Sequence, residues 1–185
     1  MLGGSASMGI VDSPADRSLP FPEPTAPADD RAAVLLGYLD YFRSVVLAKV
    51  DGLPEQALRA SLLPSGWSPL ELVRHLTFVE RRWLLWGFQG RDVGDPWGDE
   101  RDGRWNVPPE EPVEQVLAAL AAQGSRTRAV VTAHALTDVG QPGPRWDGAD
   151  PATLERVPLH LLQEYARHAG HLDVVRELID GTTGE

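Results

Sequence analysis

The sequence predicts an all-α protein, a four-helix bundle with two long loops and a flexible N-terminal tail. Its long segments carry apolar residues at the three- and four-residue spacing of a helix. Capping residues, Pro and Gly mark where these segments begin and end. No segment shows the sustained alternation of apolar and polar residues that is typical of a strand, and no Asn-Gly turn indicates a hairpin.

Residues 1–30 are expected to form an extended or disordered tail, ahead of one domain over residues 31–185. The tail lacks periodicity and is rich in helix-breaking Pro and Gly, although Phe21 is expected to dock locally. A chain of 185 residues suffices for one well-buried domain and is short for two.

The first helix is expected to begin at Asp30, whose side chain can cap it, and to end near Gly52. Pro54 is expected to open one short turn through Ala60. The next helix has the clearest start in the chain: Ser68 precedes Pro69, and Glu follows at the third helical position, which makes a capping box.

This second helix is expected to run to about Phe88. The third helix is expected over residues 112–135 and the fourth over residues 157–180, each with apolar residues at helical spacing. Residues 90–111 and 140–151 form the two long loops. Their tryptophans either cover a pocket or seal the ends of the bundle, and sealing is the favoured interpretation; these residues are Trp97, Trp105 and Trp146.

Composition excludes several classes of function. The chain has 27 acidic and 17 basic residues and a net charge of −10, which argues against nucleic-acid or anionic-membrane partners. It has no cysteine, so disulfides, thiolate metal sites and a cysteine nucleophile are excluded. No apolar run reaches the ~18 residues of a membrane span. The N-terminus shows no signal-peptide pattern, so a cytoplasmic location is expected.

One stripe of the fourth helix concentrates residues that bind metals. At about 100° per residue, Glu164, His168 and His171 all fall within about 80° of His160. Imidazole and carboxylate suit zinc and other divalent first-row metals. A further ligand must come from elsewhere, and His75, beside the apolar face of the second helix, is the obvious candidate. Hydrogen-bonded core histidines or a solvated polar face are the alternative interpretation, but burying such groups unpaired is costly.

Specific motifs add a resemblance to a known family. The run Gly66-Trp67-Ser68-Pro69, followed by His75 and by Glu80-Arg-Arg-Trp83, and the run Glu164-Tyr-Ala-Arg-His168-Ala-Gly-His171-Leu-Asp173 resemble the DinB/YfiT-like superfamily of metal-binding four-helix bundles. The resemblance covers roughly residues 30–183. It extends to the actinobacterial branch that includes the metal-binding domain of mycothiol-dependent maleylpyruvate isomerase.

The resemblance implies that His75, Glu164 and His168 are the metal ligands. Many relatives have His where this chain has Glu164, and the mycothiol branch accepts Glu there. A site built from His160, His168 and His171 is the competing choice within the stripe. The candidates for orienting the ligands through hydrogen bonds are His171, His160 and Glu80. For Glu80, a surface carboxylate paired with a nearby Arg is the alternative.

The family also implies an activity: a divalent-metal-dependent thiol-S-transferase or isomerase that uses mycothiol and acts on a small molecule. Zinc is the first choice of metal, with nickel, iron or manganese as alternatives, and a homodimer is expected. The isomerase resembled here has a further C-terminal domain in its active site, so isomerisation is the weaker expectation. A non-catalytic metal-containing or small-molecule-binding, stress-associated bundle is the alternative, and a metal-free bundle a third. Arginines that could hold an anionic substrate are Arg74, Arg81, Arg82 and Arg167.

Overall fold

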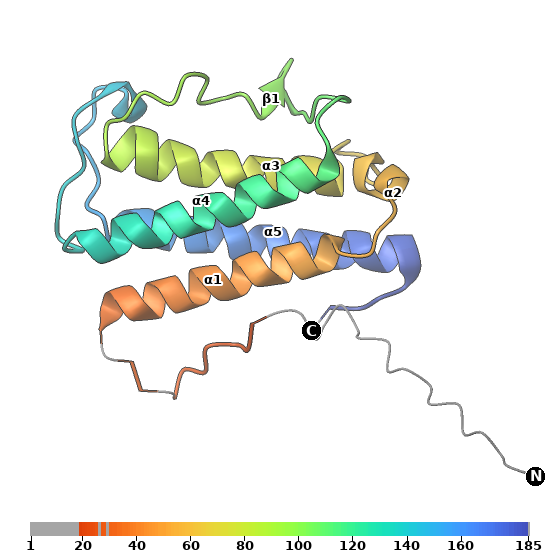
Figure 1. The fold of residues 1–185 in the computed structure, drawn as a ribbon, viewed down its shortest axis with the longest axis horizontal. Coiled ribbons are helices and arrows are strands. Elements are labelled where there is room, and N and C mark those ends of the chain that lie inside the picture. Colours follow the sequence, from red (N-terminus) through yellow and green to blue (C-terminus); the bar gives the residue numbers. More distant parts are fainter. Residues whose placement is uncertain (1–18, 26, 29, 185) are drawn as a thin grey trace, which may run out of the picture.

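The computed structural model describes residues 19–184 except 26 and 29 (Figure 1). The prediction of an all-α bundle is confirmed. Four long helices form its body: α1 (Arg31–Val50), α3 (Pro69–Glu80), α4 (Val113–Ala133) and α5 (Arg156–Asp180), with a short α2 (Glu55–Arg59) between α1 and α3. No helix in this described part of the chain is both long and apolar enough to cross a membrane.

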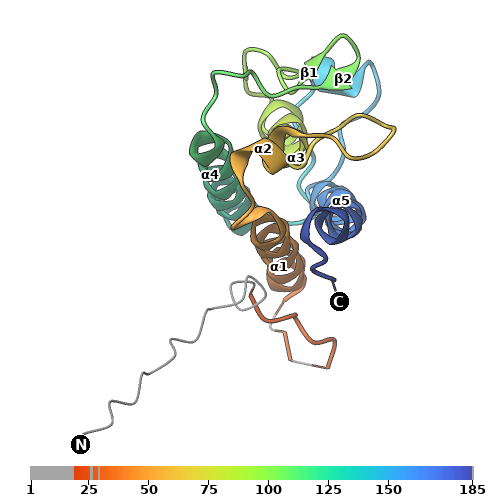
Figure 2. The same ribbon diagram turned by 90° about the vertical axis from the view of Figure 1, so that its right-hand side faces the viewer.

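The long helices occupy the corners of a square when the bundle is viewed along its axis (Figure 2). Helix α1 packs against α4 and α5, and α3 also packs against α4 and α5. Helices α3 and α4 run in the same direction, so the chain between them must return along the whole bundle (Figure 1). The first long loop is this return connection, and it passes over α3. The second and fourth predicted helices correspond to α3 and α5. These two helices are neighbours, as a metal site shared between them requires.

The expected capping box is present at the start of α3. The Ser68 hydroxyl accepts from the Glu71 amide at 3.3 Å, and the Glu71 carboxylate accepts from the Ser68 amide at 2.7 Å. The expected single α-helix to Phe88 is wrong in its second half. From Arg81 to Phe88 the chain winds as a π-helix, η2, in which the Gln89 amide donates to the Leu84 carbonyl at 2.9 Å. Such wider turns recur at functional sites because they redirect side chains.

The first long loop contains a small hairpin that the sequence analysis missed. Strands β1 (Glu100–Arg101) and β2 (Arg104–Trp105) pair antiparallel. The turn residues Asp102 and Gly103 have positive φ angles of 53° and 73°. Asp-Gly, like Asn-Gly, favours this turn because both residues tolerate positive φ. The signal was therefore in the sequence, although the all-α class is unaffected.

Part of the predicted tail lies on the bundle. The Phe21 ring contacts the rings of Tyr38 and Tyr41 edge-on, at centroid distances of 5.8 and 5.1 Å, so Phe21 docks locally as expected. The Leu19 amide donates to the Ser44 hydroxyl at 2.9 Å. The prediction for residues 1–18 lies outside the described residues. The second long loop, residues 140–151, includes a short 3₁₀ turn, η3 (Pro144–Trp146).

A buried polar cluster joins all four long helices around Glu80, which is completely buried. One carboxylate oxygen accepts from Arg43 of α1 at 2.9 Å and from the Tyr165 hydroxyl of α5 at 2.5 Å. The other accepts from the Thr127 hydroxyl of α4. Burial and the nearby Glu80 raise the pKa of Tyr165 well above its ordinary value, so its hydroxyl stays protonated and donates. The cluster specifies how the helices meet.

Candidate metal centre

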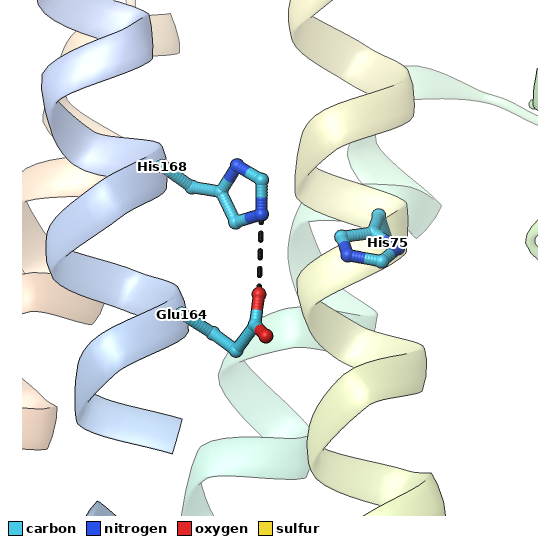
Figure 3. Close-up of side chains that lie close together, drawn as sticks. All are labelled: His75, Glu164 and His168. Carbon is cyan, nitrogen blue, oxygen red and sulfur yellow. Dashed lines mark ion pairs between the residues drawn. The ribbon is translucent and has the colours of Figure 1, made fainter. Parts of the chain in front are cut away.

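Three side chains of the types that bind metals, His75, Glu164 and His168, converge between α3 and α5 (Figure 3). The ligand atoms of His75, Glu164 and His168 all lie within 4.8 Å of one another. His168 Nε2 is 3.3 Å from a carboxylate oxygen of Glu164. Two atoms that each lie about 2.1 Å from one tetrahedral ion are about 3.4 Å apart, so this pair already has the required spacing.

The protonation state of His168 suits a ligand. Its side chain is buried, with 5% of its surface exposed, so the solvated-face interpretation does not hold for it. Burial, assisted by the charges of His75, His171 and Arg167, lowers the pKa of His168 to about 3. The imidazole is therefore neutral at physiological pH, which is the form that donates a nitrogen lone pair to a metal.

A residue that sequence reasoning missed orients His75. Asp99, from the first long loop, is completely buried, and its carboxylate lies 3.0 Å from His75 Nδ1. Because an ionised carboxylate only accepts, Nδ1 carries a proton, and in the neutral imidazole the lone pair is then on Nε2. A carboxylate behind a histidine in this way is the usual support of a metal-ligating imidazole.

Asp99 is itself held by Arg82, whose guanidinium donates to its other oxygen at 2.5 Å. Burial alone would raise the pKa of Asp99, but hydrogen bonds from His75 and Arg82 outweigh it and lower the pKa below its usual value. Arg82 was a candidate for holding an anionic substrate; the structure gives it this structural partner instead. No sequence signal separates Asp99 from the other aspartates of its loop.

The remaining members of the histidine stripe contact the ligand candidates. His171 Nδ1 lies 3.3 Å from His168 Nδ1, on the ring edge away from Glu164. His160 Nε2 lies 3.4 Å from a carboxylate oxygen of Glu164. Both are therefore placed to orient a ligand, and His75 rather than these two completes the cluster.

Glu80 does not lie at this centre. It is the last residue of α3, and its side chain points into the polar cluster with Arg43, Thr127 and Tyr165. None of its hydrogen bonds reaches His75, Glu164 or His168. It is also not the surface carboxylate of the alternative interpretation, since it is completely buried.

Tryptophans enclose the centre on the loop side. Trp105 stacks on His75, with ring centroids 4.1 Å apart and planes at 21°, and meets His168 edge-on at 5.3 Å. The ring centroid of Trp67 lies 6.0 Å from that of His171. The favoured interpretation of Trp105 as a seal at the end of the bundle is therefore wrong, because the return loop places it over the ligand candidates.

A helical bundle in which a histidine of one helix meets a Glu/His pair of its neighbour is the arrangement expected of a DinB/YfiT-like bundle, and comparison with known families agrees. The family model of the mycothiol-S-transferases matches residues 34–181. The chain therefore belongs to the mycothiol-S-transferase family. The family indicates mycothiol-dependent S-transfer and a small-molecule substrate. No curated protein matches the chain.

Proposed function

We propose that the protein is a divalent-metal-dependent enzyme that transfers mycothiol, through its sulfur atom, to a small electrophilic molecule. The observation that carries the proposal is the convergence of His75, Glu164 and His168 within 4.8 Å, joined to membership of the mycothiol-S-transferase family. Zinc is the first choice of metal because it accepts two imidazoles and a carboxylate at one tetrahedral site. Nickel, iron and manganese are the alternatives.

The donor set fits such an ion on chemical grounds. His168 is neutral, Asp99 selects the tautomer of neutral His75 that has its lone pair on Nε2, and Glu164 contributes the single carboxylate. Three protein donors leave one position of a tetrahedral ion open, which is typical of catalytic rather than structural zinc. An ion in this place would lower the pKa of a thiol bound to it, and so supply a thiolate at neutral pH.

The chain's own residues provide the surroundings for this chemistry. Asp99 and His171 hold the two imidazoles in fixed orientations, and Trp105 lies over the cluster and limits access of water. The sequence contains no cysteine, so the reacting thiol must arrive as a co-substrate. This agrees with a family that uses a low-molecular-weight thiol.

Metal analysis is the first test. Protein purified without chelators is expected to contain about one equivalent of a divalent ion per chain. His168→Ala should lose the ion and stay folded, because apolar burial along the helices supplies most of the stability. His171→Ala should weaken metal affinity by about 10–100-fold if it only orients His168. His134→Ala, at the C-cap of α4 and outside the cluster, is the matched control and should keep the metal.

Thiol addition is the second test. Mycothiol added to cobalt-substituted protein should change the absorption spectrum, and the protein should accelerate the reaction of mycothiol with a fluorogenic electrophile. Bound metal without either effect would favour the non-catalytic metal-containing or small-molecule-binding bundle. Unchanged metal content in both His168→Ala and His171→Ala would contradict the site.

Two further expectations remain predictions. The homodimer is checked by light scattering at micromolar concentration, where a monomeric mass would contradict it. The cytoplasmic location is checked by fractionating cells that express the tagged protein.

A further inference from the structure

A cleft lies next to the histidine stripe of α5. Its volume is about 530 Å³, and its walls come from η2, the second long loop and the start of α5. We call it the Arg145 groove. The residues of its lining used below are Trp83, Arg145, Trp146, Asp150, Arg156 and His160.

Arg145 is the unusual residue of this groove. Its guanidinium carbon lies 3.8 Å from the centroid of the Trp83 ring, and its Nε is buried without a hydrogen-bond partner. Within the described residues it has no ion pair or side-chain hydrogen bond. The other arginines of the described part that are buried or half-buried all bond an oxygen; they are Arg43, Arg59, Arg74, Arg81, Arg82 and Arg176.

A half-buried guanidinium without an anion is costly. Burial, together with the charge of Arg82, lowers the pKa of Arg145, which reflects this cost. A ligand that brings an anionic group into the groove would satisfy the guanidinium through charge-assisted hydrogen bonds. Arginine is well suited to this because its planar donors match a carboxylate.

The groove is built rigidly around Arg145. A Cβ atom at Gly87 of η2 would lie 3.3 Å from the side chains of both Arg145 and Trp146, so the glycine lets the loop pack tightly on the π-helix. The Trp146 indole donates to the Gln141 carbonyl at 2.8 Å. The aromatic walls and the guanidinium are therefore held in place before any ligand arrives.

His160 connects the groove to the candidate metal centre. Its ring lies 4.4 Å from the Trp83 ring in the groove wall, and its Nε2 lies 3.4 Å from Glu164. A small molecule bound with one end at Arg145 would thus extend along Trp83 towards the cluster of ligand candidates.

We propose that the Arg145 groove binds the carboxylate of the small molecule that receives the thiol, and that this substrate is an organic acid with a planar apolar body. The proposal rests on the proposed thiol transfer for the role of the ligand. The tryptophans supply apolar faces for the body. The lining holds two arginines, Arg145 and Arg156, and one carboxylate, Asp150, so its net charge is about +1, which favours a monoanion over phosphate.

Binding of benzoate to the full-length protein, with uncharged benzamide for comparison, tests the groove directly by calorimetry and tryptophan fluorescence. Arg145→Gln should weaken benzoate binding by at least about tenfold and leave benzamide unchanged, since it removes a charge-assisted contact. Arg126→Gln, in a separate cleft against α3 and α4, is the matched control and should bind benzoate normally. If Arg145→Gln does not fold, Arg145→Lys keeps the charge without the planar fork and should still bind benzoate more weakly than the native protein.

The same titrations on protein stripped of metal separate this proposal from the proposed function. Benzoate binding that persists without metal and falls in Arg145→Gln supports the groove, whatever the metal and thiol experiments show. Binding that requires the metal and ignores Arg145→Gln would mean that the carboxylate coordinates the ion, and would overturn the proposal. Absence of saturable benzoate binding, or equal binding of inorganic phosphate, would also overturn it.

Discussion

Replacing Asp99 by Asn tests whether His75 is a supported metal ligand. The substitution keeps the shape of the side chain and removes its charge. In the native protein one carboxylate oxygen accepts from Arg82 Nη1 at 2.5 Å, and the other accepts from His75 Nδ1 at 3.0 Å and from Arg82 Nη2 at 3.3 Å. An amide has only one oxygen, so one of these two acceptor positions becomes an NH₂ group.

The expected loss follows from this geometry. If the amide oxygen stays with Arg82, the NH₂ group drives His75 towards the tautomer with the proton on Nε2, which cannot ligate. If it stays with His75, the buried guanidinium of Arg82 loses its 2.5 Å bond and the charge of its partner, and keeps only the 3.3 Å contact. Removing such a support weakens metal affinity by about 10–100-fold, or about 1.4–2.8 kcal/mol.

Competition with a fluorescent chelator at neutral pH gives the metal dissociation constant of each variant. Asp102→Asn is the matched control: it lies in the same loop, is exposed, and occupies a positive-φ position that Asn also tolerates. It should bind metal like the native protein. An Asp99→Asn affinity within about twofold of the native value would refute the proposed support, because the size of effect expected is larger.

Other predictions concern the core and pH. Glu80→Gln should destabilise the protein by at least about 2 kcal/mol in urea unfolding, because breaking a buried pair costs about 3–5 kcal/mol and Asp40 still bonds Arg43; an unchanged midpoint would contradict this. Gly124→Ala should lower stability by about 1–2 kcal/mol despite better helix propensity, because its Cβ would lie 2.5 Å from Arg43 Nε, and a stabilised variant would refute it. In metal-free protein the pKa of His168, about 3 when folded, lies below its unfolded value, so the unfolded state takes up the proton first. As far as it depends on His168, the free energy of unfolding is at its maximum above about pH 6.5. It falls by up to about 1.4 kcal/mol per pH unit below that pH, and levels off near the pKa of the folded protein. Urea titrations at several pH values should show a shallower acid slope in His168→Gln, and equal slopes would contradict the assignment.

The features predicted correctly from sequence are local ones. The capping box at Ser68 and the end of the last helix at Gly181 follow from backbone hydrogen bonding within a few residues. The contact between Glu164 and His168 follows from the four-residue spacing of one helix. The π-helix after Glu80 was missed because its sequence carries ordinary helical periodicity, and the change of winding depends on what packs against it.

The sequence by itself determined the helices, the face of α5 that carries the histidines, and, through family resemblance, His75 as their partner. Only the tertiary structure decided that Asp99 and Trp105 lie at the centre and that Arg145 lines a groove beside it. These residues belong to long irregular loops, which have no repeating geometry to relate sequence position to direction. Their positions depend on the return of the chain along the bundle between two parallel helices, and contacts of that range arise only when the helices pack.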